Sequence, residues 1–458
     1  MIESLNFSGT KMARMISFFR AHKRVITFFL VAWLVFFVFW LIPNWSEGPF
    51  YFVFFSAMFL VLVASQLFWL RRVGELGKRL SPRKRWRKVL GAAGLLVYLL
   101  LLAFNLFAGI NKGSGFNLRA ALLEAPFSIW FVGSVLGFFV VMLLWTVTCF
   151  ARVISWAFNK FTTPFKPELQ SPARRRFLEQ AAIVLSAAPF VAGTYGLFYG
   201  RLNLETTYRR IRLRRLPKAF EGFRIVQLSD LHISPFMTAE EIRRYVAIAN
   251  QLKGDLVVLT GDFLTYDPAA QGAVVQTLSA LKAPYGVFGC LGNHEYITET
   301  EESITRLFAN EQIRILRQER VAIQSHDGTL NLIGIDYQQA RFSRDHDGHL
   351  VDRYMEGSEK LVMPGTANIL LNHNPNAFDR AAELGIDLML SGHTHGGQLS
   401  LELVHRGLCF SRLATPYISG RYEKGGSQVY VNRGIGTISF PIRLGARPEI
   451  TVLELTRT

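Results

Sequence analysis

Residues 223–232 read FRIVQLSDLH, and this stretch determines the predicted fold of the second half of the chain. The run Phe223 to Leu228 is short and apolar with β-branched residues, which predicts a buried strand. Asp230 and His232 follow the strand directly, so a carboxylate and an imidazole leave the strand end together. In α/β folds, functional groups gather at the carboxyl ends of the strands. The stretch therefore predicts an α/β domain with a functional site at the edge of its sheet.

Four further groups of polar residues follow short apolar runs in the same half of the chain. They are Gly261-Asp262, Gly292-Asn293-His294-Glu295, His373, and Gly392-His393-Thr394-His395. Strands are predicted at residues 223–228, 255–260, 285–291, 330–335, 367–371, 386–390, 428–431 and 449–455, and helices at 238–252, 270–281 and 299–311. Helices alternate with the early strands and are few among the later ones, which predicts a mixed sheet system. Residues 201–458 are long enough for one domain of this class.

The polar groups together form a set of nitrogen and oxygen ligands. Asp230 and His232 can bind one ion, and Asp262 can share its two carboxylate oxygens between two ions. The remaining candidate ligands are the amide of Asn293 and the imidazoles of His373, His393 and His395. A set without thiolates suits Zn, Mn or Fe better than Ca or Mg. We therefore predict two divalent metal ions, roughly 3.5 to 4 Å apart, which would bind a phosphoryl oxygen and activate a water.

His294 is predicted to act on protons instead of metal. It follows Asn293 in the same turn, where its imidazole could protonate a leaving oxygen or stabilise the charge that forms there. Glu295 is predicted to orient that imidazole, as carboxylates near metal-site histidines commonly do. Each fragment alone has a simpler explanation, because strand-end aspartates often cap turns or helices. The complete set, with each member after a strand, makes coincidence a poor explanation.

The first 200 residues carry nearly all of the net charge of +17. They hold 22 Lys and Arg against 6 Asp and Glu, whereas residues 201–458 hold 29 against 28. About 20 apolar helical residues cross a hydrocarbon core, and four stretches meet this length: residues 25–42, 50–70, 89–110 and 127–150. A fifth stretch, 178–199, is rich in Ala and Gly and contains Pro189. We expect it to span the membrane too, with an interfacial helix as the alternative.

Basic residues alternate along this half, which predicts its topology. Residues 1–24 hold five, 71–88 nine and 151–177 six, while the intervening loops hold none (43–49) or two (Lys112 and Arg119). The positive-inside rule then places residues 1–24 of a multi-pass membrane protein in the cytoplasm. Five spans put residues 201–458 outside the cytoplasm. The basic runs could also bind nucleic acid or anionic lipid, but topology explains their spacing more economically, and we do not expect nucleic acid as a partner.

Two further features bear on the compartment. Residues 174–178 read RRRFL, which resembles the twin-arginine export motif, although some 170 residues precede it. The alternative is an ordinary cytoplasmic basic anchor, and both interpretations place the following domain outside. Three cysteines, Cys149, Cys290 and Cys409, predict no disulfide framework and leave the compartment undecided.

Residues 201–458 resemble the calcineurin-like metallophosphoesterase superfamily. The resemblance rests on SDLH at 229–232, GHTHGGQ at 392–398, NRG at 432–434 and PEI at 448–450. The last two motifs are similar to the bacterial branch of membrane-anchored or twin-arginine-exported phosphodiesterases, which implies that the multi-pass protein lies in a bacterial inner (cell) membrane. The resemblance implies a four-layer α/β/β/α sandwich of two mixed sheets, which would follow an all-α transmembrane bundle of four to five helices in residues 25–200. No ligand position of the family pattern is missing, whereas the N-terminal spans depart from the simplest members.

The resemblance also implies a role for each site residue. One ion takes Asp230, His232 and His395, the other takes Asn293, His373 and His393, Asp262 bridges them, and His294 is the acid. The expected activity is hydrolysis of a phosphodiester or phosphomonoester by metal-activated water. Since the near-neutral catalytic half would be tethered beside a bilayer, we expect a lipid-linked or envelope substrate.

Alternatives to this function remain open. One relative of this type removes UMP from UDP-2,3-diacylglucosamine on the cytoplasmic face, which here would require an even number of spans. A non-catalytic membrane sensor with a metal-binding domain is a second alternative, and a proton donor beside a full ligand set counts against it. The small basic surplus of residues 201–458 counts against a nuclease.

Overall fold

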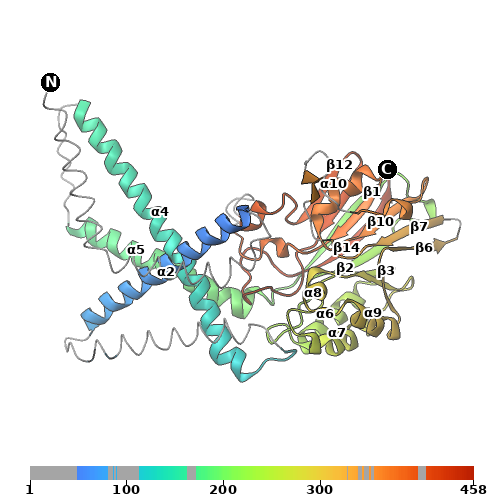
Figure 1. Cartoon of the computed structure of the whole chain (residues 1–458), viewed down its shortest axis with the longest axis horizontal. Coiled ribbons are helices and arrows are strands. Elements are labelled where there is room, and N and C mark those ends of the chain that lie inside the picture. Colours follow the sequence, from blue (N-terminus) through green and yellow to red (C-terminus); the bar gives the residue numbers. More distant parts are fainter. Residues whose placement is uncertain are drawn as a thin grey trace. The chain divides into compact units, whose positions relative to one another are not determined.

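The computed structural model describes residues 49–80, 86, 89, 113–161, 172–326, 328–338, 343–344, 350–351, 355–400 and 409–458. The predicted span 25–42 and nearly all of the predicted span 89–110 lie outside these residues. The chain divides into two compact units, which are described separately (Figure 1). One unit comprises residues 1–99 and 131–190, and the other comprises residues 100–130 and 191–458.

Long helices form the first unit. They are α2 (Pro49–Leu80), α4 (Ala125–Phe161) and α5 (Pro172–Tyr195), which cover the predicted stretches 50–70, 127–150 and most of 178–199. Within the described part of the chain, the stretch Ala120–Ser155 is long and apolar enough to cross a membrane, and α2 contributes a shorter apolar segment, Phe59–Trp69. Helix formation at these stretches is therefore confirmed, and their insertion into a bilayer stays a prediction.

Polar contacts join α2 to α4 inside this unit. The Gln66 side chain donates a hydrogen bond to the hydroxyl of Ser134 at 2.8 Å, and the Trp69 indole donates to the Ser134 carbonyl at 2.8 Å. Gln66 and Ser134 are both buried. A buried amide is stable in an apolar helix pair when it finds such partners.

Two six-stranded mixed sheets form the second unit. The first has the order β1-β14-β2-β3-β4-β5, and the second has the order β12-β13-β11-β10-β7-β6. The strands of the first sheet are β1 (Glu205–Leu213), β2 (Arg224–Leu228), β3 (Leu256–Thr260), β4 (Val287–Cys290), β5 (Ile313–Ile315) and β14 (Glu449–Arg457). Those of the second are β6 (Glu319–Ser325), β7 (Gly328–Gly334), β10 (Ala367–Leu371), β11 (Leu388–Ser391), β12 (Gly420–Lys424) and β13 (Ser427–Val431). A further short pair is β8 (Ser343–Arg344) with β9 (Leu350–Val351).

The helices of this unit cover the outer faces of the two sheets. The first sheet carries α6 (Ala239–Gln251), α7 (Gln271–Leu278) and α9 (Glu301–Asn310), and the second carries α10 (Phe378–Glu383) (Figure 1). The single turn α8 (Asn293–Ile297) follows the end of β4. Helix α6 begins where the sequence predicts it. Thr238 caps it by accepting a hydrogen bond from the Glu241 amide at 3.2 Å, while the Glu241 carboxylate accepts one from the Thr238 amide at 2.8 Å.

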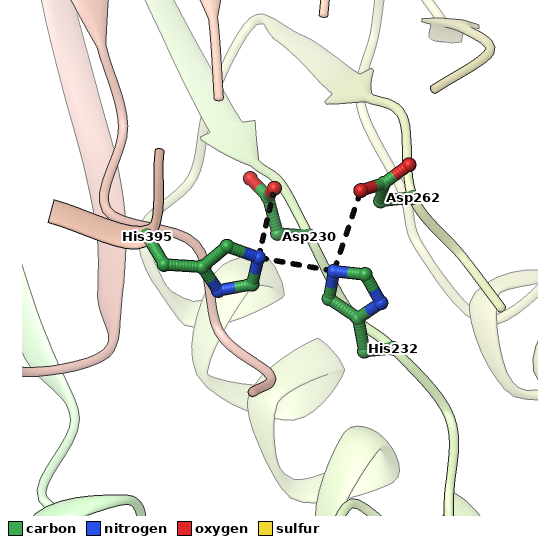
Figure 2. Close-up of side chains that lie close together, drawn as sticks. All are labelled: Asp230, His232, Asp262 and His395. Atoms are coloured by element: carbon green, nitrogen blue, oxygen red, sulfur yellow. Dashed lines mark hydrogen bonds and ion pairs between the residues drawn. The ribbon is translucent and has the colours of Figure 1, made fainter. Parts of the chain in front are cut away.

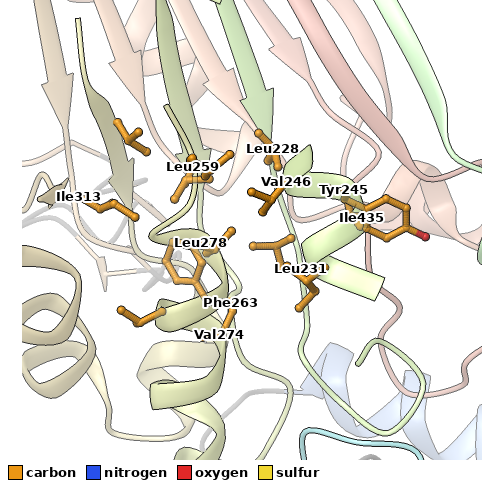
Figure 3. Packing of buried hydrophobic residues seen from close by; sticks show 14 of the residues in the cluster. Leu228, Leu231, Tyr245, Val246, Leu259, Phe263, Val274, Leu278, Ile313 and Ile435 are labelled. Atoms are coloured by element: carbon orange, nitrogen blue, oxygen red, sulfur yellow. The ribbon is translucent and has the colours of Figure 1, made fainter. Parts of the chain in front are cut away.

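Both faces of each sheet are buried, which gives the predicted α/β/β/α order. On β3, Val257 packs toward the helices of the first sheet, and its neighbour Val258 packs between the sheets. On β10, Ile369 lies in the layer between the sheets and Leu370 lies in the cluster that includes Phe378 of α10. The helix-side cluster of the first sheet is drawn in Figure 3, with labelled side chains Leu228, Tyr245, Val246, Leu259, Phe263 and Leu278.

Candidate metal centre

All nine predicted site residues follow the ends of strands in the second unit, residues 100–130 and 191–458. Asp230 and His232 come after β2, Asp262 after β3, and the Asn293–Glu295 turn after β4. His373 comes after β10, and His393 and His395 come after β11. The first three segments belong to one sheet and the last two to the other. The site therefore receives side chains from both sheets.

The first group of ligand atoms consists of Asp230, His232, Asp262 and His395, whose side chains point toward one another (Figure 2). The Nε2 atoms of His232 and His395 lie 3.1 Å apart. His395 Nε2 lies 3.4 Å from Asp230 Oδ1, and His232 Nε2 lies 3.4 Å from Asp262 Oδ2. One ligand atom from each residue lies within 4.8 Å of all the others, which is compatible with a single metal ion.

The second group contains Asp262 again, with His373 and His393. Asp262 Oδ2 lies 3.1 Å from His373 Nε2, and that nitrogen lies 3.2 Å from His393 Nδ1. The amide oxygen of Asn293 is 3.2 Å from the same His373 nitrogen. Asp262 thus belongs to both groups, and Asn293 adjoins the second.

Backbone strain is concentrated at these residues. Five of them have positive φ angles in the left-handed region: Asp230 (49°), His232 (49°), Asp262 (55°), His393 (72°) and His395 (53°). Such conformations cost on the order of 1–3 kcal/mol each in residues other than glycine, and they cluster at functional sites. The rest of the fold therefore holds these side chains in place against a local preference.

The buried imidazoles and carboxylates differ in charge. Burial raises the pKa of Asp262, but attraction to His373 and His294 outweighs it and holds the pKa well below its usual range. Burial opposes a charge on His373 as well, yet Asp262 raises the pKa of His373 to about 10. Without metal, these two residues therefore form an ion pair.

His393 and His395 stay neutral. Burial, together with the neighbouring His373, lowers the pKa of His393 to about 3. Burial, His232 and Arg443 hold the pKa of His395 well below its usual value. Neutral imidazoles are the form that binds metal.

His294 is held in one tautomer. Its Nδ1 lies against the carbonyl oxygen of Thr265, which can only accept, so Nδ1 carries the proton. The ring is 4.6 Å from the His232 ring and 5.2 Å from the Tyr266 ring, centroid to centroid. Burial lowers the pKa of His294 to about 4. The imidazole is neutral at pH 7, and its Nε2 is the atom able to exchange a proton.

Glu295 supports the site differently from the sequence-based expectation. Its carboxylate accepts hydrogen bonds from four backbone amides, at 2.8 to 3.1 Å: those of Asp262, Phe263, Leu264 and Gly292. The carbonyl of Thr265 performs the orienting role that was predicted for Glu295. Because the carboxylate accepts hydrogen bonds from amides of both the turn after β3 and the turn after β4, it links these two turns.

Arg443 is a site residue that the sequence analysis did not predict. Its side chain is fully buried, and its Nη2 lies 3.2 Å from Nδ1 of His395. The signal available in the sequence is a lone arginine in the apolar stretch ISFPIRLG, residues 438–445, which resembles no ligand pattern. Tertiary packing brings it behind His395.

The closing motifs of the sequence hold the chain together near the site. In the NRG motif, the amide side chain of Asn432 accepts from the Gly434 amide at 2.7 Å. Arg433 donates from Nε to Glu449 of the PEI motif at 2.9 Å. Glu449 is buried and also accepts from the hydroxyl of Tyr430 at 2.6 Å. These residues attach β14 to the loop after β13.

The burial and the chemistry of the side chains in the site are suitable for a divalent metal ion. Asp230 Oδ2 is buried and has no hydrogen-bond partner among the residues that the structure describes. A buried carboxylate oxygen without a donor costs free energy that a bound cation would offset. Burial also raises the pKa of Asp230 above its usual value. Four imidazoles, two carboxylates and an amide converge here, which is a suitable donor set for such an ion.

Comparisons with known proteins agree with this geometry. The family model for calcineurin-like phosphoesterases matches residues 223–397. The chain is 32% identical over 302 residues to the uncharacterized metallophosphoesterase YkuE of Bacillus subtilis, an alignment that covers 63% of this chain and 100% of YkuE. It is 30% identical over 290 residues to the phosphodiesterase YaeI of Escherichia coli, covering 62% of this chain and 99% of YaeI.

A longer alignment is found with an animal protein. The transmembrane protein with metallophosphoesterase domain of Bos taurus is 28% identical over 362 residues, covering 76% of this chain and 79% of the bovine protein. The matched family model, the relatives aligned over their full length and the buried ligand groups lead to one conclusion. The chain belongs to the calcineurin-like metallophosphoesterases and is a phosphoester hydrolase.

Proposed function

We propose that the chain is a membrane-anchored phosphoesterase that binds two divalent ions and hydrolyses a lipid-linked or envelope phosphoester. The observation that carries the proposal is the position of Asp262, which belongs to both groups of ligand atoms. A carboxylate shared by two adjacent groups can bridge two ions, and paired ions bind the two oxygens of an in-line displacement. Mn, Fe or Zn fits this nitrogen and oxygen donor set.

The ligands divide between the two ions as follows. Asp230, His232 and His395 would hold one ion, Asn293, His373 and His393 the other, and Asp262 both. When bound, the ions lower the pKa of a water and neutralise charge on the phosphoryl group. The rest of the fold holds five of these residues in strained backbone conformations, so their ligand atoms would be in place before the ions arrive.

His294 would supply the proton for the leaving oxygen. Since its Nδ1 proton is held by the carbonyl of Thr265, Nε2 must take up a second proton before it can donate one. Burial opposes the resulting cation, as the pKa of about 4 shows. The negative charge of a bound phosphoester favours it, so protonation and substrate binding would support each other.

Apolar side chains exposed on the catalytic unit support a substrate at a membrane. In residues 113–130 the exposed side chains include Phe116, Leu118 and Leu122, at 59%, 74% and 61% exposure, and Phe198 and Tyr199 after α5 are also exposed. Phe116 packs against Phe236, four residues after His232, with ring centroids 6.0 Å apart. Exposed apolar side chains of this size are typical of a surface in contact with lipid or protein. They would place the metal centre close to the polar headgroups of a bilayer.

Hydrolysis of a generic substrate tests the enzymatic part of the proposal. Purified full-length protein loaded with Mn should hydrolyse bis-p-nitrophenyl phosphate, and a lipid-linked phosphoester should be turned over faster than its water-soluble headgroup analogue. Full occupancy by metal with no hydrolysis of any phosphoester would favour the membrane sensor instead.

The compartment needs a separate experiment. We propose that the predicted spans place residues 201–458 outside the cytoplasm. A reporter fused after Thr458 that is active only in an oxidising, extracytoplasmic space should then be active. A reporter that is active only in the cytoplasm would show that residues 178–199 do not span the membrane. That result would favour a pyrophosphatase acting on a UDP-diacylglucosamine type of substrate.

A further inference from the structure

A helical turn lies directly against the loop that carries Arg443. Helix α5 continues into the π-helical turn η4 (Gly196–Gly200), and the amide of Arg443 donates a hydrogen bond to the Gly196 carbonyl at 3.3 Å. A Cβ atom at Gly200 would lie 2.2 Å from the Arg443 carbonyl oxygen, and one at Gly196 would lie 2.9 Å from the same oxygen. These distances are shorter than any real Cβ contact, so the two glycines permit this close approach.

The side chain of Arg443 extends from this loop into the interior. It is 1% exposed, and the contacts of its guanidinium among the described residues are with carbonyl oxygens and one imidazole. Its hydrogen bonds go to backbone carbonyl oxygens, those of Arg433, Gly436, Ala446 and His395, at 2.5 to 3.4 Å. A buried cation needs such a set of acceptors to be stable. The planar guanidinium can reach them all from one position because its five donors form a fixed fork.

The same guanidinium contacts the imidazole of His395. Nη2 of Arg443 lies 3.2 Å from Nδ1 of His395, and Nε2 on the other side of the ring lies 3.4 Å from Asp230 Oδ1. The guanidinium and Asp230 contact the ring on opposite sides and so restrict its rotation. Nη2 donates its two hydrogens to the carbonyls of Arg433 and Gly436, so its contact with Nδ1 is one of packing and leaves Nε2 able to bind a metal ion. The ligands of the second group, His373 and His393, make their hydrogen bonds elsewhere, with Thr260, Asn293 and each other.

We propose that the Gly196–Gly200 turn is a positioning element of the metal centre, which seats Arg443 and thereby fixes the His395 ring for metal binding. The inference rests on the proposed function, because it takes His395 as a metal ligand. It assigns a role to the chain just after α5 that a simple linker would not have. A displacement of this turn should weaken the binding of the ion held by Asp230, His232 and His395 and should not affect the binding of the other ion.

Alanine substitutions within the same helical segment test the inference. Gly200→Ala introduces the 2.2 Å contact, whereas Gly193→Ala is a matched control, since a Cβ there meets its nearest atoms at 3.9 Å. Mn binding to full-length protein in detergent is followed by isothermal titration calorimetry and by electron paramagnetic resonance of the coupled pair. Outer-shell changes typically cost tenfold to a hundredfold in metal affinity. We expect Gly200→Ala to lower the affinity for one Mn ion by about tenfold or more and to leave the affinity for the other ion unchanged. The resonance signal of the coupled Mn pair should then be replaced by that of a single Mn ion.

A second variant guards against a folding defect. Arg443→Lys keeps the positive charge, but a single ammonium group cannot donate to all four carbonyl oxygens and also pack against the His395 ring. This variant should lower the affinity for the same one of the two ions. Circular dichroism and thermal unfolding of the metal-free protein should show that the chain is folded. If either folded variant binds both ions with the affinities of the Gly193→Ala protein, the inference is wrong. Loss of both ions to the same degree would also overturn it.

The outcomes are distinct from those that decide the proposed function. A wild-type protein that binds two ions but hydrolyses no phosphoester would refute the enzyme, and the metal titrations of the variants would still decide the role of the turn. Conversely, an active enzyme whose Gly200→Ala variant binds both ions normally would keep its function and lose this positioning element.

Discussion

The Oδ2 atom of Asp262 lies 3.1 Å from Nε2 of His373, and this buried pair is at the junction of the two groups of ligand atoms. Because the carboxylate is ionised and the imidazole is protonated, the positive charge of His373 balances the negative charge of Asp262. The metal-free site is thus compensated internally. This relationship makes Asp262 the residue on which both sites depend.

Asp262→Asn is therefore expected to weaken the binding of both ions. An amide keeps the size of the side chain but loses the negative charge that would bridge the metals. Hydrolysis of bis-p-nitrophenyl phosphate should fall on the order of a thousandfold, since paired metals contribute several kcal/mol to stabilising the transition state. Metal analysis should show fewer than one ion per chain. Asp230→Asn is the matched control and should lose one ion; equal metal contents in the two variants would contradict the bridging role.

Replacement of His294 should separate chemistry from metal binding. His294→Ala removes the proton donor and leaves every ligand in place, so kcat should fall by roughly a hundredfold to ten-thousandfold. Inductively coupled plasma mass spectrometry should find the wild-type metal content. A substrate whose leaving group needs no proton, such as a nitrophenyl ester, should be affected less than an alkyl phosphodiester. Loss of metal in this variant would instead identify His294 as a ligand.

Removal of metal should destabilise the catalytic unit. Each ion that binds only the folded chain stabilises it by about 2.7 kcal/mol at a free concentration of 100 times Kd. Treatment with a chelator should lower the melting temperature, and added Mn should restore it in a concentration-dependent manner. Mg, which prefers oxygen ligands, should restore it less. A melting temperature that is independent of all these ions would argue against the buried ligand groups.

Glu449 predicts a dependence of stability on pH. Burial raises the pKa of this carboxyl, but attraction to Arg433 and hydrogen bonds from Thr207, Tyr430 and Arg433 outweigh it, so the pKa lies below 4.5. A carboxyl with a lowered pKa in the folded state stabilises the fold above its unfolded pKa, and this contribution is lost as the pH falls through the folded pKa.

The variant Glu449→Gln measures this contribution. It should destabilise the protein by about 2 kcal/mol at pH 7, as judged by urea unfolding of the metal-free form. The difference from wild type should shrink below pH 4.5 as the wild-type carboxyl takes up a proton. A difference that stays constant from pH 7 to pH 4 would show that the negative charge of Glu449 does not contribute.

The strands that the sequence analysis missed share one position in the fold. In the two six-stranded sheets they are β1, β5, β6 and β12, and each is an edge strand of its sheet; the short pair β8 and β9, which has no central strand, was missed as well. An edge strand is paired on one side and partly exposed, so its sequence lacks the continuous apolar run of a central strand. In β12, for example, every side chain is at least partly exposed. The central strands were predicted to within a few residues because their neighbours bury both faces.

The site residues were predictable for a related reason. Ligands that follow central strands appear in sequence as polar groups directly after apolar runs, and all nine were brought to one site. Arg443 and Thr265 were missed because their contacts with His395 and His294 depend on tertiary packing. The orienting role predicted for Glu295 is taken by Thr265 for the same reason, since three of the four backbone amides that Glu295 binds belong to the turn after β3.

The origin of the ligands in both sheets has a mechanical consequence. Asp230, His232 and Asp262 extend from one sheet and His373, His393 and His395 from the other, while the layer between the sheets is mostly apolar and is crossed by hydrogen bonds such as those from Gln227 to the Ser391 carbonyl and from Tyr430 to Glu449. Ions bound by both sets would cross-link the sheets at one edge and add resistance to shear between them. Pulling the two sheets apart with an optical trap should then require more force when metal is bound, and a chelator should lower that force.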